Sequence, residues 1–80
     1  MRIDKFLKNS RIIKRRTVAK EACEQGRVFI NETQAKPGSV VKVGDIVKVT
    51  FATSTIKVRV LSVDDNVKKG DATKLYEYID

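Results

Sequence analysis

The sequence contains no histidine, a single cysteine and no long run of apolar residues. Without histidine, the commonest general base and the usual zinc-finger ligand pattern are both absent. One cysteine cannot form an internal disulfide, and no stretch approaches the ~18 apolar residues that a membrane span requires. The N-terminus alternates charged and apolar residues and lacks the apolar block of a signal peptide. A cytoplasmic setting without a membrane partner is therefore expected.

The remaining reactive groups are poorly placed for catalysis. Cys23 lies among small residues of an expected helix and has no imidazole to activate it, which favours a core position. Asp64 and Asp65 form the only adjacent carboxylate pair, in a polar stretch that is more typical of a solvated turn than of a metal site. The glycines match neither a phosphate-binding loop nor a dinucleotide motif. We expect no enzymatic activity, no catalytic residue, no metal and no cofactor.

The basic charge is concentrated at one end of the chain. The net charge of the 80 residues is +7. Residues 1–20 hold eight basic residues and one acid, Asp4, whereas residues 21–80 hold nine basic and nine acidic residues. A generally solvated basic surface would spread the excess along the chain. A cationic segment on a charge-balanced body is instead typical of a protein that binds a polyanion.

The spacing of apolar residues predicts two short helices near the N-terminus. Ile3, Phe6 and Leu7 share one helical face, so they are expected in the core. Thr17 is expected to cap the second helix, and Gly26 to end it in a left-handed conformation. Between the helices lies a short basic connector with a buried plug at residues 12–13. The narrow, small-residue face of the second helix comprises Val18, Ala19, Ala22 and Cys23.

Beyond the second helix the apolar pattern alternates, which predicts four short strands near residues 27–31, 34–36, 43–51 and 55–63. Asp71 is expected to cap a final short helix with Ala72, Leu75, Tyr76 and Ile79 on one stripe. The predicted fold class is α+β, with two packed helices on a small four-stranded, mainly antiparallel sheet and a short C-terminal helix. The predicted division is one domain at 1–63 and a linker with the short C-terminal helix at 64–80.

Several short motifs, in order, resemble the alpha-L RNA-binding motif, also called the S-four domain. They are RIDKFL at 2–7, SR at 10–11, RTVA at 16–19, GRV at 26–28, Asn31, and VGDI at 43–46, so that the resemblance covers about residues 1–52. It implies a domain that binds folded RNA. Glu32 departs from the pattern, since many relatives have glycine after the turn asparagine, and this affects the expected type of hairpin.

Within this family, the chain resembles small stand-alone proteins that act on stalled large ribosomal subunits. That resemblance implies binding to large-subunit ribosomal RNA and to the peptidyl-tRNA of an obstructed subunit. It also implies cooperation with a factor of the RqcH type, which adds C-terminal alanine tails to the stalled chain. A general RNA-binding factor for ribosome recycling or assembly is the alternative within the family. The chain is expected to be monomeric.

The two-helix unit is expected to present its cations to RNA phosphates, with arginines forked onto phosphate oxygens and lysines acting as mobile charges. Asp4 is expected to hold a neighbouring arginine, with Arg16 as the candidate, while Ser10 and Thr17 support the site. The expected RNA-binding residues are Arg2, Lys5, Lys8, Arg11, Lys14, Arg15, Arg16 and Lys20.

Two other classes of protein share parts of this pattern. A DNA-binding helix-turn-helix protein also places a basic helix after a short turn, but residues 17–25 hold two acids and one lysine, poor chemistry for a major groove. A membrane-surface peptide would use the basic first helix, but the three large apolar residues of that helix are needed for the core. Phe6 is assigned to that core, and the other four aromatic residues form no evident platform for stacking single strands.

Overall fold

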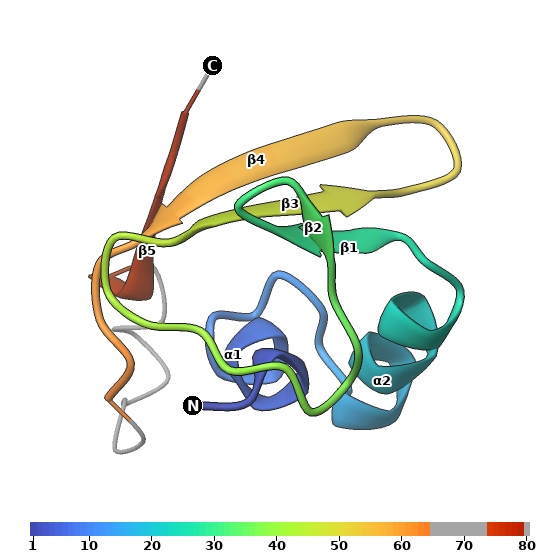
Figure 1. The fold of residues 1–80 in the computed structure, drawn as a ribbon, viewed down its shortest axis with the longest axis horizontal. Coiled ribbons are helices and arrows are strands. Elements are labelled where there is room, and N and C mark those ends of the chain that lie inside the picture. The colour runs from blue at the N-terminus through green and yellow to red at the C-terminus, as the bar shows by residue number, and fades with distance from the viewer. Residues whose placement is uncertain (65–73, 80) are drawn as a thin grey trace.

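The computed structural model describes residues 1–64 and 74–79, which form a layer of helices packed on one face of an antiparallel sheet (Figure 1). The helices are α1 (Ile3–Asn9) and α2 (Arg16–Glu24). The strands are β1 (Val28–Ile30), β2 (Thr33–Gln34), β3 (Ile46–Thr50), β4 (Thr55–Val60) and β5 (Tyr76–Tyr78). The sheet order is β2-β1-β3-β4-β5, and each neighbouring pair is antiparallel.

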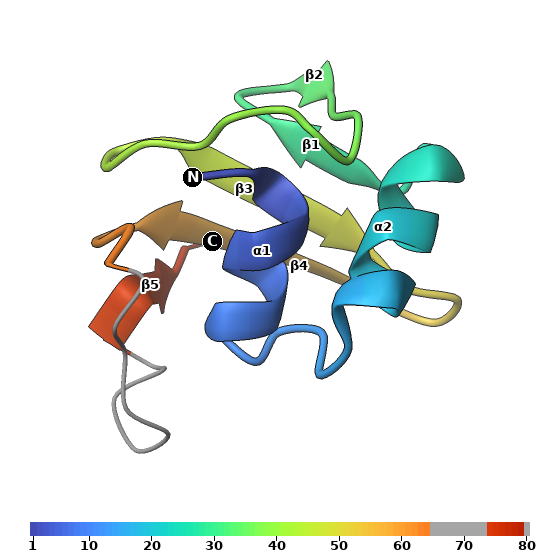
Figure 2. The same cartoon turned by 90° about the horizontal axis from the view of Figure 1, so that it is seen from below.

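The core lies between this sheet and the two helices (Figure 2). In β3 and β4, the alternation predicted from the sequence places Val47, Val49, Val58 and Val60 on the covered face, where all four are buried. Burying a side chain of this size contributes about 1.5–3 kcal/mol, so these pairs supply much of the stability of so small a domain. The buried side chains of α1 are, as predicted, Ile3, Phe6 and Leu7.

Helix α2 differs from the prediction at its N-terminus. Arg15 is the N-cap residue, in an extended conformation with φ −118° and without a side-chain capping bond. The prediction that Thr17 caps the helix is wrong, because Thr17 lies inside the first helical turn and is exposed. Ala19, Ala22 and Cys23 are buried as predicted, whereas Val18 is 42% exposed. Successive helical residues are about 100° apart, so Val18 and Ala19 lie on different faces.

The C-terminus of α2 closes with a Schellman motif. Gly26 has φ +75°, its N–H donates to the Cys23 carbonyl (3.0 Å), and the Arg27 N–H donates to the Ala22 carbonyl (3.0 Å). The predicted left-handed glycine is therefore confirmed. The Arg27 carbonyl then accepts the Thr50 N–H at 2.8 Å, which fixes this residue at the edge between α2 and the sheet.

A two-residue turn joins β1 to β2, which begins one residue earlier than predicted. Asn31 (φ 50°) and Glu32 (φ 71°) both have positive φ between the paired residues Ile30 and Thr33. This is the geometry of a type I′ turn, in which glycine is favoured at the second position, so the departure at Glu32 leaves the hairpin type unchanged. The Asn31 amide donates to buried Asp45 (3.1 Å) and accepts the Ile46 N–H (2.9 Å).

The predicted C-terminal helix is wrong within the residues that the structure describes. Residues 74–75 lie in a 3₁₀ turn, and β5 then pairs with β4, so the sheet has five strands instead of four. Tyr76 pairs with Val60 and Tyr78 with Val58. Tyrosine favours strands, and β4 would otherwise end the sheet with an open edge. Leu75 is buried as predicted, whereas Asp71 and Ala72 lie outside the described residues.

Candidate nucleic-acid interface

A buried carboxylate lies between two arginines that come from different elements. Asp4 is 2% exposed in the first turn of α1, and its Oδ1 accepts the Lys5 backbone N–H at 2.8 Å. The Nη2 atom of Arg2 lies 3.2 Å from Asp4 Oδ2, and the Nη2 atom of Arg16 lies 3.5 Å from Asp4 Oδ1. The predicted pairing of Asp4 with Arg16 is confirmed, and Arg2 is a second partner that the prediction did not include.

The backbone holds both arginines in place. Arg2 is the N-cap of α1 and forms an isolated antiparallel bridge with Val40. Beside this bridge, the Ile3 N–H donates to the Ser39 carbonyl at 2.7 Å. Arg16 is the first residue of α2. Their side chains remain 52% and 47% exposed, so both arginines are accessible to a ligand. A guanidinium anchored at one nitrogen loses less freedom when its remaining donors bind phosphate oxygens.

Thr17 and Lys20 extend this cluster along α2. Together with Arg2, Asp4 and Arg16 they line a shallow depression of about 280 Å³. Lys20 follows Arg16 by one helical turn, so the two side chains lie on the same face of α2. An anion that entered this depression would meet three cations around one buried carboxylate.

The other predicted residues are placed in three different ways. Lys14 and Arg15 are exposed and line a separate hollow. Lys5 and Lys8 lie on α1 and line neither hollow. Ser10 is buried, and its hydroxyl donates to the Leu7 carbonyl at 3.2 Å, so it supports the end of α1.

Arg11 occupies a strained position in the connector. Its φ is 61°, immediately after the C-cap residue Ser10, where glycine or asparagine is favoured. A left-handed conformation costs a residue with a side chain roughly 1–2 kcal/mol. The side chain is exposed and forms no ion pair with any described residue. The Arg11 N–H donates to the Lys8 carbonyl at 3.1 Å, so this conformation closes α1 and leaves the charged side chain on the surface.

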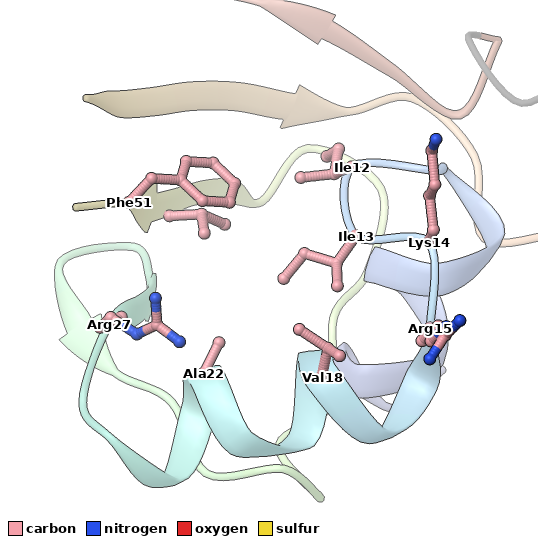
Figure 3. Close-up of a pocket in the computed structure, with 9 residues that line it drawn as sticks. Ile12, Ile13, Lys14, Arg15, Val18, Ala22, Arg27 and Phe51 are labelled. Carbon is pink, nitrogen blue, oxygen red and sulfur yellow. The ribbon is translucent and has the colours of Figure 1, made fainter. Parts of the chain in front are cut away.

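Arg27 is a cation that the sequence analysis did not include in the site. Its side chain is partly buried, and its Nε atom has no hydrogen-bond partner among the described residues. The residue follows Gly26 directly and lines one hollow together with the connector residues, on the opposite side of that hollow (Figure 3). The only sequence signal was its place in the GRV motif, which gives no indication that Arg27 shares a hollow with residues 12–15.

Cys23 is a core residue, as predicted. It is buried, and burial, together with the negative charges of Asp4 and Glu24, raises the pKa of its thiol to about 11. The thiol is therefore protonated at neutral pH and is a weak nucleophile. Across residues 1–64 and 74–79, no three potential ligands among aspartate, glutamate and cysteine converge on a possible metal site. No described helix is long and apolar enough to cross a membrane.

Residues 1–47 match the S4 domain family, and the chain belongs to this family. The expected resemblance to the alpha-L motif is thereby confirmed. Proteins named RQC P-site tRNA stabilizing factor are similar to nearly the whole chain. The Halalkalibacterium halodurans protein is 52% identical, over 96% of this chain and 88% of its own length. The Bacillus subtilis protein is 51% identical, over 95% of this chain and 88% of its own length.

A solved structure supports the same assignment of fold. The trimeric structure of Vibrio cholerae heat shock protein 15 superposes with a TM-score of 0.89 at 26% sequence identity, covering 99% of this chain and 81% of that protein. The likeness to the stand-alone quality-control members of the family (RqcP), inferred from the sequence, is confirmed by the relatives above.

Proposed function

We propose that this protein binds ribosomal RNA and tRNA on stalled large ribosomal subunits in the cytoplasm, and acts there in quality control of translation. The cluster of Arg2, Asp4 and Arg16 is the observation that carries the proposal. It holds two half-exposed guanidinium groups in a fixed arrangement at the cationic end of the chain. The name of the similar proteins, RQC P-site tRNA stabilizing factor, supports the same role.

Binding in this proposal is to the RNA backbone. Arg2, Arg16 and Lys20 contact phosphates around the Asp4 depression, and the exposed cations of the connector add further contacts. Phosphate contacts fix the position and orientation of a protein, whereas structured RNA is recognised chiefly by its shape. The protein thus holds peptidyl-tRNA and ribosomal RNA in place, without being an enzyme, while a factor of the RqcH type adds alanine residues to the stalled chain.

The test is a pull-down of the tagged protein from cells that accumulate stalled chains. The wild-type protein should copurify with free large subunits that carry peptidyl-tRNA. Arg2→Ala with Arg16→Ala should abolish both this copurification and alanine tailing, because the double variant lacks both arginines held by Asp4. Arg2→Lys with Arg16→Lys keeps the charge but cannot fork onto a phosphate, so partial activity is expected.

A matched control removes the same charge elsewhere. Lys36→Ala with Lys42→Ala neutralises two exposed lysines outside the Arg2–Asp4–Arg16 cluster and should leave copurification and tailing intact. Equal thermal unfolding of all variants would show that the fold is preserved. Recovery of the wild-type protein chiefly on small subunits, or undiminished tailing by the Arg2 and Arg16 double alanine variant, would contradict the proposal.

A further inference from the structure

A second hollow, of about 370 Å³, lies between α2, the connector and the end of β3 (Figure 3). Its interior is apolar. Ile13, Ala22 and Val49 are buried there, while Val18 and Phe51 form more accessible walls. Phe51 directly follows β3, and its N–H donates to the Ser54 carbonyl at 2.6 Å, which holds the backbone behind the ring. The volume falls within the roughly 300–1,000 Å³ that is typical of sites for small ligands.

Three cations surround this apolar interior. Lys14 and Arg15 lie on the side of the connector, and Arg27 lies opposite them with its guanidinium directed toward the hollow (Figure 3). None of the three forms an ion pair with another residue in the described ranges. The Nε atom of Arg27 is buried and lacks an acceptor. The remaining guanidinium nitrogens, which Figure 3 shows directed toward the hollow, are the donors that a ligand with an acceptor could bind.

The hollow and the Arg2–Asp4–Arg16 cluster both include residues at the start of α2. Arg15 lines the hollow and Arg16 pairs with Asp4, so consecutive residues at the start of α2 belong to the two sites. The two sites share no lining residue, but an RNA strand has an extended backbone and can contact both. The ligand that suits this combination carries phosphates together with a flat apolar face.

We propose that the hollow binds an unstacked nucleobase of the RNA. The base lies against the Phe51 ring and the side chain of Val18, and its flanking phosphates contact Lys14 and Arg15. The Arg27 guanidinium donates to a ring nitrogen of the base or to a phosphate oxygen. Proteins commonly recognise RNA through bases that are splayed out and stacked on aromatic side chains. The inference deepens the proposed function and rests on it, since it requires that this surface bind RNA.

The test uses three short hairpin RNAs that differ at one position: one has a bulged adenosine, one has an abasic nucleotide in the same bulge, and one is fully paired. The bulged and abasic hairpins carry the same number of phosphates, so a difference in their affinity reports the base alone. The wild-type protein should bind the bulged adenosine about tenfold more tightly than the abasic hairpin, the scale expected for one stacked base.

Phe51→Leu keeps an apolar side chain but removes the aromatic face. It should remove most of the difference in affinity between the bulged-adenosine and abasic hairpins. The variant should bind the abasic and paired hairpins as the wild type does. Val18→Gln, at an exposed position, should reduce the difference without a risk to the core. Lys14→Ala should weaken binding of both bulged hairpins equally. As a second measurement, 2-aminopurine in place of the bulged adenosine should change its fluorescence on binding to the wild type and much less with Phe51→Leu.

Equal affinity of the wild type for bulged and abasic hairpins would overturn the inference while leaving RNA binding intact. Failure to bind any hairpin or isolated large subunits would instead contradict the proposed function itself. A Phe51→Leu variant that binds all three RNAs like the wild type, but loses a protein from the ribosome pull-down, would assign the hollow to a protein and also overturn the inference.

Discussion

Replacing Arg11 with glycine is expected to stabilise the protein and, at the same time, to weaken RNA binding. Arg11 has φ 61°, a conformation that costs a residue with a side chain roughly 1–2 kcal/mol. Glycine avoids this strain but adds about 0.5–1 kcal/mol of conformational entropy to the unfolded chain. The expected net gain is about 0.5–1 kcal/mol, which corresponds to a rise in Tm of about 2–8 °C for a domain of this size.

Binding should change in the opposite direction. The exposed Arg11 side chain forms no ion pair with a described residue, so its contribution to stability through contacts is small, whereas a phosphate contact would be lost. Loss of one such contact should reduce the slope of log affinity against log salt by about 0.7–0.9. Fluorescence anisotropy with a large-subunit RNA fragment at several salt concentrations measures the slope, and thermal or urea unfolding measures the stability.

Arg11→Ala separates the two effects. Alanine removes the charge but keeps a Cβ atom in the left-handed conformation, so this variant should lose the same RNA affinity without gaining stability. If Arg11→Gly lowers the Tm, the conformation of Arg11 is not strained as inferred. If both variants bind RNA with wild-type affinity and salt dependence, Arg11 does not belong to the interface.

Arg16→Ala should weaken RNA binding by about 1–3 kcal/mol and leave the Tm nearly unchanged, because Arg2 still pairs with Asp4. If this variant unfolds while each folded molecule still binds RNA normally, Arg16 has a structural role instead. The buried Leu7 provides the contrast, since Leu7→Ala should lower the free energy of unfolding by roughly 2–5 kcal/mol. The wild-type salt slope should be about −4 to −5, for roughly six phosphate contacts, and a slope near −1 would contradict a multi-contact interface. Folding raises the pKa of Cys23 from 9.0 to about 11, so between these values the folded state keeps a proton that the unfolded state loses. This contribution to stability is retained below pH ~9 and declines by about 2 kcal/mol as pH rises toward 11. The difference in the free energy of unfolding between wild type and Cys23→Ala, measured by urea unfolding, should therefore change over this range.

Local patterns were sufficient to predict most of the elements. The spacing of Ile3, Phe6 and Leu7 predicted the buried face of α1, and Gly26 predicted the end of α2. The alternation along β3 and β4 predicted which side chains enter the core. These features depend on residues within a few positions of one another, and the helical and strand periodicities are direct consequences of backbone geometry.

The C-terminal strand shows where local patterns were not sufficient. Leu75, Tyr76 and Ile79 have the spacing of a helical face, but a segment this short also fits a strand. The available edge of β4 decides between them, since pairing with it satisfies backbone groups that would otherwise lie on an open edge. That edge is formed by residues far back in the chain, so no pattern within the segment itself contains this information.

The sequence by itself determined that one end of the chain carries the whole charge excess, and therefore that a polyanion is the expected partner. Only the tertiary structure divided those cations between two sites, with Arg2, Arg16 and Lys20 around Asp4, and Lys14 and Arg15 beside an apolar hollow that Arg27 completes. Charge is a sum over residues and can be counted in any order. A site depends on distances between side chains, which are decided by how α1, α2 and β3 pack together.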